Sequence, residues 1–175
     1  GYGNLTKSIA SIGPKKIFAI EKDKKLASYL IKKFKNFKNV KIINQDILKI
    51  IEKNNLDKNI VVYGNLPYNI STKILASLIM LKKWPPWYDI LILMFQKEVA
   101  DRIIAEQNSR DYGRLSILTS WKMNVKKIID IGPENFRPSP KVKSSLLTFV
   151  PRTEYLNFKC SSLEHVTNVF FNQRR

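Results

Sequence analysis

Short runs of apolar residues, rich in isoleucine and valine, recur along the chain and are bounded by polar residues and glycines. Runs of this length and composition are typical of β-strands buried in a sheet. The pattern predicts strands at residues 16–21, 40–46, 59–65, 89–96, 125–131 and 144–150.

Between these runs, apolar residues recur at every third or fourth position, which is the spacing of one face of an α-helix. Leu26, Tyr29, Leu30 and Phe34 follow this rule after the first predicted strand. Helices are predicted at residues 5–13, 23–34, 47–53, 71–81, 97–106, 114–121 and 161–175. Ser71 is expected to cap the fourth helix, since its hydroxyl oxygen can accept an unpaired amide of the first turn.

Strands that alternate with helices over short connections indicate an α/β fold, with a mostly parallel sheet covered on both faces. The last two predicted strands are joined by a proline-rich loop without a helix, so they are expected to form a C-terminal antiparallel hairpin. The pattern changes after Tyr155, which predicts one domain over residues 1–155 and the start of a helical domain over 156–175. The opening turn has no strand before it, so we expect a chain truncated at both ends.

The chain carries 31 lysine and arginine residues against 14 aspartate and glutamate residues, a formal net charge of +17. This charge favours a polyanionic partner, because each phosphate contact releases counterions on binding. Nucleic acid is the first candidate for this partner, and an anionic membrane surface is the second. The alternative explanation of the positive charge is the codon bias of an AT-rich genome. The apolar runs are far shorter than the roughly 20 residues of a membrane span, so no spanning segment is expected.

Cys160 is the only cysteine of the chain, and His165 is the only histidine. An intrachain disulfide and a thiolate metal cluster are therefore excluded, and a reducing, cytoplasmic setting fits best. His165 is expected to be an ordinary structural or surface residue. No metal site is predicted, and hydrolysis by a metal ion or a catalytic triad is disfavoured.

Ligands of doubly wound sheets bind beyond the carboxyl ends of the strands. Gly1 and Gly3 would let the backbone approach a ligand closely and then turn into a helix. Glu21, about twenty residues further along, ends a strand where a carboxylate can accept hydrogen bonds from both hydroxyls of a ribose. Asp46 follows the next strand and can accept a hydrogen bond from an exocyclic amine. For both acids the alternative is a helix-capping role.

These strand ends indicate a cofactor that contains adenosine. A nicotinamide dinucleotide usually requires a third glycine for close packing of helix against strand, and Thr6 occupies that place. S-adenosylmethionine has no pyrophosphate to be bound, so it fits these residues better.

The segment Asn65-Leu66-Pro67-Tyr68 follows a predicted strand and suits the methylation of an exocyclic amine. The lone pair of such an amine is delocalised, so a catalyst must hold both N–H groups with two neighbouring acceptors. The side-chain oxygen of Asn65 and the backbone carbonyl of Leu66 supply them, and Pro67 disfavours helix at Leu66. Tyr68 offers a flat face for stacking, worth about 1–3 kcal/mol per base. The alternative is an ordinary proline turn.

A methyl group on a sulfonium is already activated, so this chemistry requires no acid, base, thiol or metal. Catalysis then consists of positioning and charge placement. Because a duplex or a folded RNA hides the amine, the target base must be flipped out into the site.

With these motifs, the sequence resembles the KsgA-type (RsmA) ribosomal RNA small-subunit adenine dimethyltransferases. The matching segments are GYGNLT, AIEKDKKL, NQDIL, GNLPYNIST, FQKEVADRI, YGRLS, FRPSPKVKSS and FNQRR. The resemblance implies a Rossmann-like S-adenosylmethionine-dependent methyltransferase fold, with residues 1–155 as the catalytic domain. It also implies transfer of methyl groups to adjacent adenines near the 3′ end of 16S rRNA in ribosome biogenesis, by a monomer acting on a pre-assembled 30S particle in the cytoplasm.

The same resemblance assigns roles to individual residues. The cofactor-binding positions of the family match Gly1, Gly3, Glu21, Asp46 and Asn65. The positions of its target-amine site match Asn65, Leu66, Pro67 and Tyr68. Phe136, in the proline-rich loop, matches an aromatic residue near the flipped base, and its alternative role is to anchor that loop to the core.

Three rival functions stay open. An Erm-type methyltransferase would modify large-subunit rRNA, and FQKEV and YGRLS favour the small-subunit branch over it. A noncatalytic nucleic-acid binder, like the related mitochondrial transcription factors, would not need an intact segment from Asn65 to Tyr68. A methyltransferase for small-molecule or protein amides would more often carry two prolines there.

The sequence departs from the family pattern mainly at its ends. The family has a strand that ends in an acid and a glycine before the position of Gly1, and a small helical domain after the NQRR segment. Without that central strand, two strands of the sheet are expected to lack a partner and to expose an edge. The piece alone is therefore expected to fold poorly or to bind S-adenosylmethionine weakly.

Overall fold

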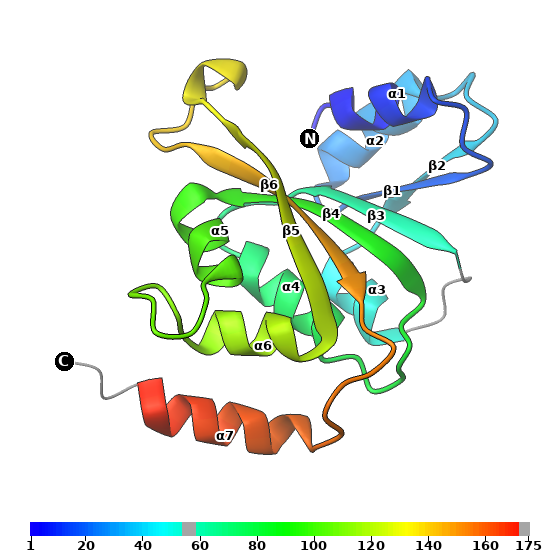
Figure 1. Cartoon of the computed structure of the whole chain (residues 1–175). Coiled ribbons are helices and arrows are strands. Elements are labelled where there is room, and N and C mark those ends of the chain that lie inside the picture. Colours follow the sequence, from blue (N-terminus) through cyan, green and yellow to red (C-terminus); the bar gives the residue numbers. More distant parts are fainter. Residues whose placement is uncertain (54–58, 172–175) are drawn as a thin grey trace. The chain divides into compact units, whose positions relative to one another are not determined.

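The computed structural model describes residues 1–53 and 59–171, which form two compact units (Figure 1). The first unit contains the elements α1 to α3, and the second contains the elements β3 to α7. Within the described residues, no helix has the length and the apolar character that crossing a lipid bilayer requires.

The first unit is a two-stranded parallel sheet with helices. Its elements are α1 (Asn4–Ala10), β1 (Ile17–Glu21), α2 (Lys24–Lys33), β2 (Val40–Asn44) and α3 (Ile47–Lys53). The register pairs Ile17 with Val40 and Glu21 with Asn44, so both strands end at the same edge of the sheet. α2 packs on both strands, and its buried residues are Ala27 and Leu30, with Phe34 buried at its C-cap.

The second unit is built on a four-stranded sheet in the order β3-β4-β6-β5. Its elements are β3 (Ile60–Asn65), α4 (Ser71–Ile79), β4 (Tyr88–Gln96), α5 (Lys97–Ile104), α6 (Arg114–Lys122), β5 (Met123–Ile131), the 3₁₀ turn η1 (Pro133–Asn135), β6 (Ser144–Pro151) and α7 (Cys160–Phe171). β3 runs parallel to β4, whereas β6 runs antiparallel to both β4 and β5. The predicted α/β class and the C-terminal antiparallel hairpin are therefore confirmed.

Alternating side chains of β4 and β6 form the centre of the second unit's core. Leu91 pairs with Phe149 and Leu93 pairs with Leu147, and all four side chains are at most 1% exposed. The ring of Phe95 lies edge-on to the ring of Phe149, with 6.0 Å between their centroids. This dense packing gives β4 and β6 fixed positions, so residues at their ends are held rigidly.

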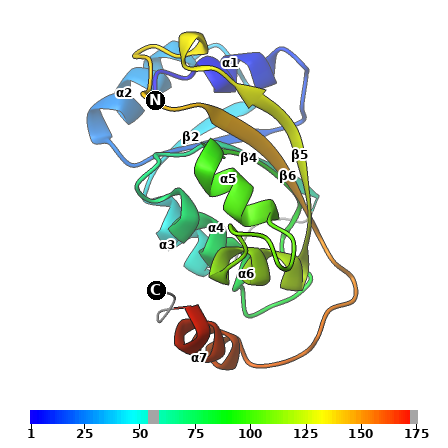
Figure 2. The same ribbon diagram turned by 60° about the vertical axis from the view of Figure 1, so that its left-hand side comes forward.

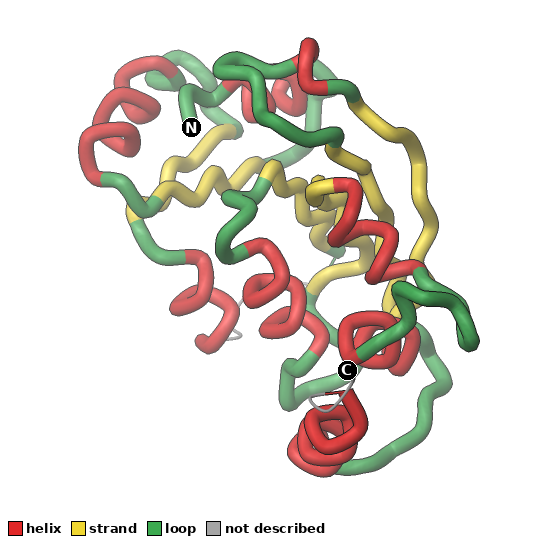
Figure 3. The backbone as a smooth tube through the Cα atoms, turned by 90° about the vertical axis from the view of Figure 1, so that its left-hand side faces the viewer, coloured by secondary structure: helices red, strands yellow, loops and turns green. Residues whose placement is uncertain are grey.

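The C-terminal helix is attached to the second unit. The indole N–H of Trp121 donates to the carbonyl of Leu156 over 2.7 Å, and the Trp121 ring stacks on Phe158 at 4.8 Å. α7 lies next to α6, as Figures 2 and 3 show, and the guanidinium of Arg114 in α6 donates to the side chain of Asn168 in α7. The start of a separate helical domain at residue 156 stays a prediction.

The differences from the sequence-based elements are small and lie at element ends. The predicted final helix begins at Cys160, its residues 172–175 lie outside the described part of the chain, and His165 is exposed on it, as expected. Two strands were expected to lack a partner and to expose an edge. Within residues 1–53 and 59–171, β1 pairs only with β2, and β3 pairs only with β4. Among the described residues their other sides carry no strand, so both are edge strands.

Candidate active site

The opening turn of the first unit depends on a glycine. Gly3 precedes α1 with φ +80°, and a Cβ atom there would lie 2.7 Å from Leu30 Cδ2 and 2.8 Å from Phe34 Cε2. Any other residue would meet both the strain of the left-handed region and this contact with the face of α2. Gly1 differs, because a Cβ atom there would meet no other atom within 4 Å.

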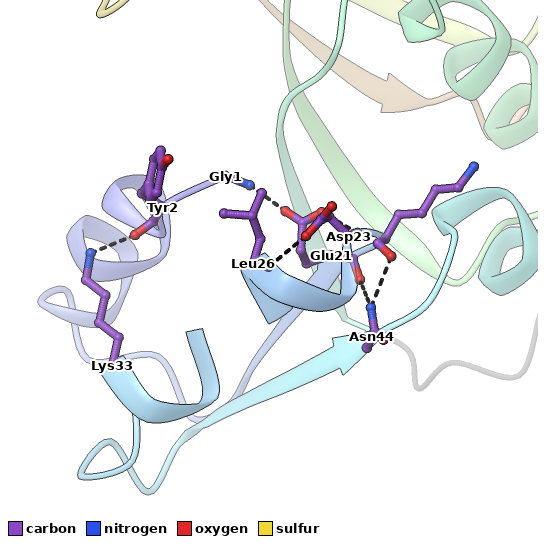
Figure 4. Close-up of polar contacts among 8 residues, drawn as sticks. Gly1, Tyr2, Glu21, Asp23, Leu26, Lys33 and Asn44 are labelled. Carbon is purple, nitrogen blue, oxygen red and sulfur yellow. Dashed lines mark hydrogen bonds and ion pairs between the residues drawn. The ribbon is translucent and has the colours of Figure 1, made fainter. Parts of the chain in front are cut away.

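A lysine from α2 holds the turn at its middle residue. The ammonium of Lys33 donates to the carbonyl of Tyr2 over 2.7 Å (Figure 4). The Tyr2 ring packs edge-on against Tyr29, with 5.9 Å between the ring centroids. Lys33 was missing from the sequence-based site, because its contact joins residues 31 positions apart and no local motif indicates it. The glycine turn is thus fixed from the side of α2.

Glu21 lies at the carboxyl end of β1 and its side chain is 15% exposed. One carboxylate oxygen accepts a hydrogen bond from the Asp23 amide over 2.9 Å, and the other lies at the backbone nitrogen of Gly1 (Figure 4). Burial raises the pKa of Glu21, and the hydrogen bond from the Asp23 amide lowers it. When it is ionised, the carboxylate is an acceptor only.

The helix-capping alternative for Glu21 is wrong. Asp23 caps α2, since its side chain accepts a hydrogen bond from the Leu26 amide over 2.8 Å (Figure 4). Asn44, at the end of β2, donates its side-chain amide to the carbonyls of Glu21 and Lys22 at 2.9 and 3.1 Å. The two strand ends are therefore cross-linked, and the Glu21 carboxylate is not needed for the helix.

Asp46 follows β2, and its side chain binds the first turn of α3. This is the helix-capping role that was given above as the alternative to cofactor binding. Its Oδ1 accepts a hydrogen bond from the Leu48 amide over 3.0 Å in the first turn of α3. Its Oδ2 pairs with the ammonium of Lys22 at 2.8 Å, and this hydrogen bond is the main reason why the pKa of Asp46 lies below its usual value. Because Lys22 is 76% exposed, the pair is weak, and a donor from a ligand can replace it at little cost.

In the second unit, β3 ends in a bend that presents polar groups. A Cβ atom on Gly64 would lie 2.8 Å from Leu93 and 2.9 Å from the Leu66 side chain, so glycine lets the bend pack closely on β4. Asn65 is exposed, and the described part of the chain supplies no hydrogen bond to its side chain or to the carbonyl of Leu66. Both acceptors are therefore available to a ligand.

The bend is closed by hydrogen bonds on either side of Tyr68. The carbonyl of Pro67 accepts one from the Ile70 amide over 3.1 Å. The hydroxyl of Ser71 donates to the Tyr68 carbonyl over 3.1 Å, and the Tyr68 hydroxyl lies 2.8 Å from the hydroxyl oxygen of Ser144. The prediction that Ser71 caps α4 is wrong, since Ile70 is the N-cap and Ser71 is already the first helical residue.

Phe136 lies in the connection from β5 to β6, directly after η1, and is half-buried. Its amide donates to the carbonyl of Pro133 over 3.1 Å. Within the described residues its ring contacts no other aromatic ring, and it is not among the buried core residues. The same connection ends at Ser144, the hydrogen-bond partner of Tyr68. The role of Phe136 near a flipped base stays a prediction.

The predicted residues thus form two groups. Gly1, Gly3, Glu21 and Asp46 lie at the glycine turn and the strand ends of the first unit, where contacts join Gly1 to Glu21 and Asp46 to Lys22. Asn65 to Tyr68 form one continuous bend in the second unit. Parallel strands with a glycine turn, acidic strand ends and an Asn-Leu-Pro-Tyr bend define the class of Rossmann-like methyltransferase folds.

Comparison with known proteins narrows this class. The chain belongs to the ribosomal RNA adenine dimethylase family, whose model matches residues 1–175. It is 53% identical over 176 residues to ribosomal RNA small subunit methyltransferase A of Pelagibacter ubique, covering 100% of this chain and 66% of that protein. It is 40% identical to the protein of the same name from Xanthobacter autotrophicus, covering 100% of this chain and 62% of that protein. The chain therefore spans less than two thirds of the length of these relatives.

Solved structures agree with the fold. The chain is similar to a dimethyladenosine transferase from Plasmodium falciparum with a TM-score of 0.83 and 27% identity, covering 100% of this chain and 62% of that one. The 23S rRNA methyltransferase ErmE follows with a TM-score of 0.70 and 24% identity, covering 96% and 64%. At this identity the likeness to ErmE concerns the fold alone.

Proposed function

We propose that this chain carries the catalytic part of an rRNA adenine N6,N6-dimethyltransferase, which transfers methyl groups from S-adenosylmethionine to adjacent adenines near the 3′ end of small-subunit rRNA. The observation that carries the proposal is the bend after β3, where the Asn65 side chain and the Leu66 carbonyl are two neighbouring acceptors that receive no hydrogen bond from residues 1–53 and 59–171. The family of the chain and the names of its relatives support the choice of rRNA as the substrate.

The bend acts on the target amine by hydrogen bonding. The Asn65 oxygen and the Leu66 carbonyl accept the two N–H groups of the adenine N6, which favours the pyramidal amine and frees its lone pair for attack. The Tyr68 ring supplies a stacking surface for the flipped base. Each transfer replaces one N–H of N6 by a methyl group, and the displaced proton passes to solvent. One N–H remains after the first transfer, so only one acceptor is engaged by the amine in the second round.

The residues of the first unit fit the adenosine part of S-adenosylmethionine. Gly3 leaves the backbone of the turn free of a side chain, and the ionised Glu21 accepts hydrogen bonds from ribose hydroxyls. Asp46 accepts a hydrogen bond from the exocyclic amine of the cofactor's adenine in place of its surface pair with Lys22. When bound, S-adenosylmethionine supplies a methyl group on a positively charged sulfur.

The proposal extends to the setting of the reaction. The net charge of +17 favours RNA as the partner, because each contact between a basic side chain and a backbone phosphate releases counterions and so favours binding. We propose a monomer that acts on rRNA in a pre-assembled 30S particle in the cytoplasm. The two relatives at 53% and 40% identity carry a small-subunit name, which favours this reading over the Erm-type alternative.

Primer extension on rRNA from cells with and without the protein tests the proposed function. Dimethylated adenines block base pairing, so reverse transcription of small-subunit rRNA is expected to stop near its 3′ end only when the protein is present. A stop lost from large-subunit rRNA instead would support the Erm-type function. Unchanged stops in both rRNAs would contradict the methyltransferase function and favour the noncatalytic binder.

A further inference from the structure

We propose that Ser144 is a positioning residue for this reaction: its buried hydroxyl holds the phenol of Tyr68, and so keeps the tyrosine ring in place for the flipped adenine. The inference rests on the proposed function and adds a residue to the machinery of the same site. Ser144 does not touch the substrate, because it acts through Tyr68.

The contact joins a buried group to a half-buried one. Ser144 is 0% exposed, and its hydroxyl oxygen lies 2.8 Å from the hydroxyl of the half-buried Tyr68. A buried hydroxyl that loses its partner incurs a desolvation penalty, so the two groups favour staying together. A tyrosine needed only as an apolar platform would not require this second polar contact.

Ser144 is held more firmly than the residue it positions. It is the first residue of β6 and pairs in register with Gln96 of β4 and with Ile131 of β5. The preceding carbonyl, that of Lys143, accepts a hydrogen bond from the Lys97 amide at the start of α5 over 2.9 Å. Ser144 therefore offers a rigid reference point at the end of the central strands.

The backbone and the ring of Tyr68 are fixed by different groups. Ser71 binds the Tyr68 carbonyl, whereas Ser144 binds the phenol at the far end of the side chain. Loss of the Ser144 hydroxyl should leave the bend intact and free only the ring to turn about its side-chain torsions. A variant without the Ser144 hydroxyl is therefore expected to fold normally but to hold the Tyr68 ring less firmly against the flipped adenine.

The neighbouring Ser145 provides a matched control. It is also 0% exposed, but its hydroxyl donates to Oδ1 of Asp130 over 2.7 Å, on the other side of the strand. Ser145→Ala removes an equally buried hydroxyl from the adjacent position without touching Tyr68. A merely structural effect of losing a buried hydroxyl would appear in both serine variants.

A double-mutant cycle in the intact protein tests the inference. Its members are the wild type, Ser144→Ala, Tyr68→Phe and the double variant, and Ser145→Ala is the control. For each protein, kcat and KM are measured with rRNA as the substrate. We expect kcat to fall about fivefold to tenfold in each of the first two variants, and no further in the double variant, since both remove the same hydrogen bond. Ser145→Ala should keep the wild-type kcat, and the affinity for S-adenosylmethionine should be unchanged throughout.

The inference is overturned if kcat of Ser144→Ala stays within twofold of wild type, if the two single effects multiply in the double variant, or if Ser145→Ala is impaired as strongly. Failure of the proposed function is distinguishable in the same assay. It would appear in the wild-type protein as an absence of methyl transfer to rRNA, and would overturn both proposals.

Discussion

Asn65→Ala is expected to slow methyl transfer by at least about a hundredfold, while the affinity for S-adenosylmethionine stays nearly unchanged. The substitution removes one of the two acceptors that hold the target amine, an interaction that is strongest in the transition state. Removal of one such contact costs roughly 10²–10³ in kcat in other enzymes. Single-turnover rates on rRNA and calorimetric titration with S-adenosylmethionine measure the two quantities separately.

Asn124→Ala is the matched control, because Asn124 is an exposed asparagine of the same unit that lies on β5, away from the bend. It should methylate at the wild-type rate. If Asn65→Ala lost cofactor affinity and methylation in equal measure, Asn65 would belong to the cofactor site alone, and the role assigned to it at the amine would be wrong.

Gly3→Ala is expected to destabilise the folded protein by about 2–5 kcal/mol, since a left-handed conformation costs a residue with a Cβ roughly 1–2 kcal/mol and overpacking adds about 1–3 kcal/mol. The new Cβ would lie 2.7 Å from Leu30 of α2 and 2.8 Å from Phe34 at its C-cap, and both side chains are buried. Binding of S-adenosylmethionine should weaken as well, because the turn must move. Chemical denaturation and calorimetric titration of the intact protein measure these effects.

Gly13→Ala separates the cost of the left-handed conformation from the cost of the contact that a new Cβ makes. Gly13 has nearly the same dihedral angle, φ +76°, but a Cβ atom there meets nothing within 4 Å. Only the conformational cost of roughly 1–2 kcal/mol should remain, with cofactor binding intact. Equal destabilisation by the two substitutions would show that the contact with α2 does not matter.

The fold was largely predictable from the sequence because its signals are local. Helical spacing identifies Leu26, Tyr29, Leu30 and Phe34 as one apolar face. Leu30 and Phe34 are buried as that spacing predicts, whereas Tyr29 is 46% exposed. The proline-rich connection without a helix predicted the antiparallel pair β5 and β6. The order of Asn65, Leu66, Pro67 and Tyr68 after a strand likewise predicted the bend.

The contacts that support the site were not predictable in this way. Tyr68 and Ser144 are 76 residues apart, and Lys33 reaches the Tyr2 carbonyl across 31 residues, so each pair depends on the packing of whole elements. Ser71 shows how a local rule can fail. A serine before a helical run favours a cap, but the helix includes Ser71 and its hydroxyl turns back to the Tyr68 carbonyl.

The central claim is that the bend after β3 presents paired oxygens and an aromatic face to an extruded adenine. A crystal structure of the intact protein with a nonreactive analogue of S-adenosylmethionine and an RNA containing the target adenine tests it most directly. We expect the Asn65 side-chain oxygen and the Leu66 carbonyl to lie about 2.7–3.2 Å from the adenine N6, with the Tyr68 ring stacked on the base. A target amine held by other groups, with Asn65 and Tyr68 facing away from the donor, would contradict the claim.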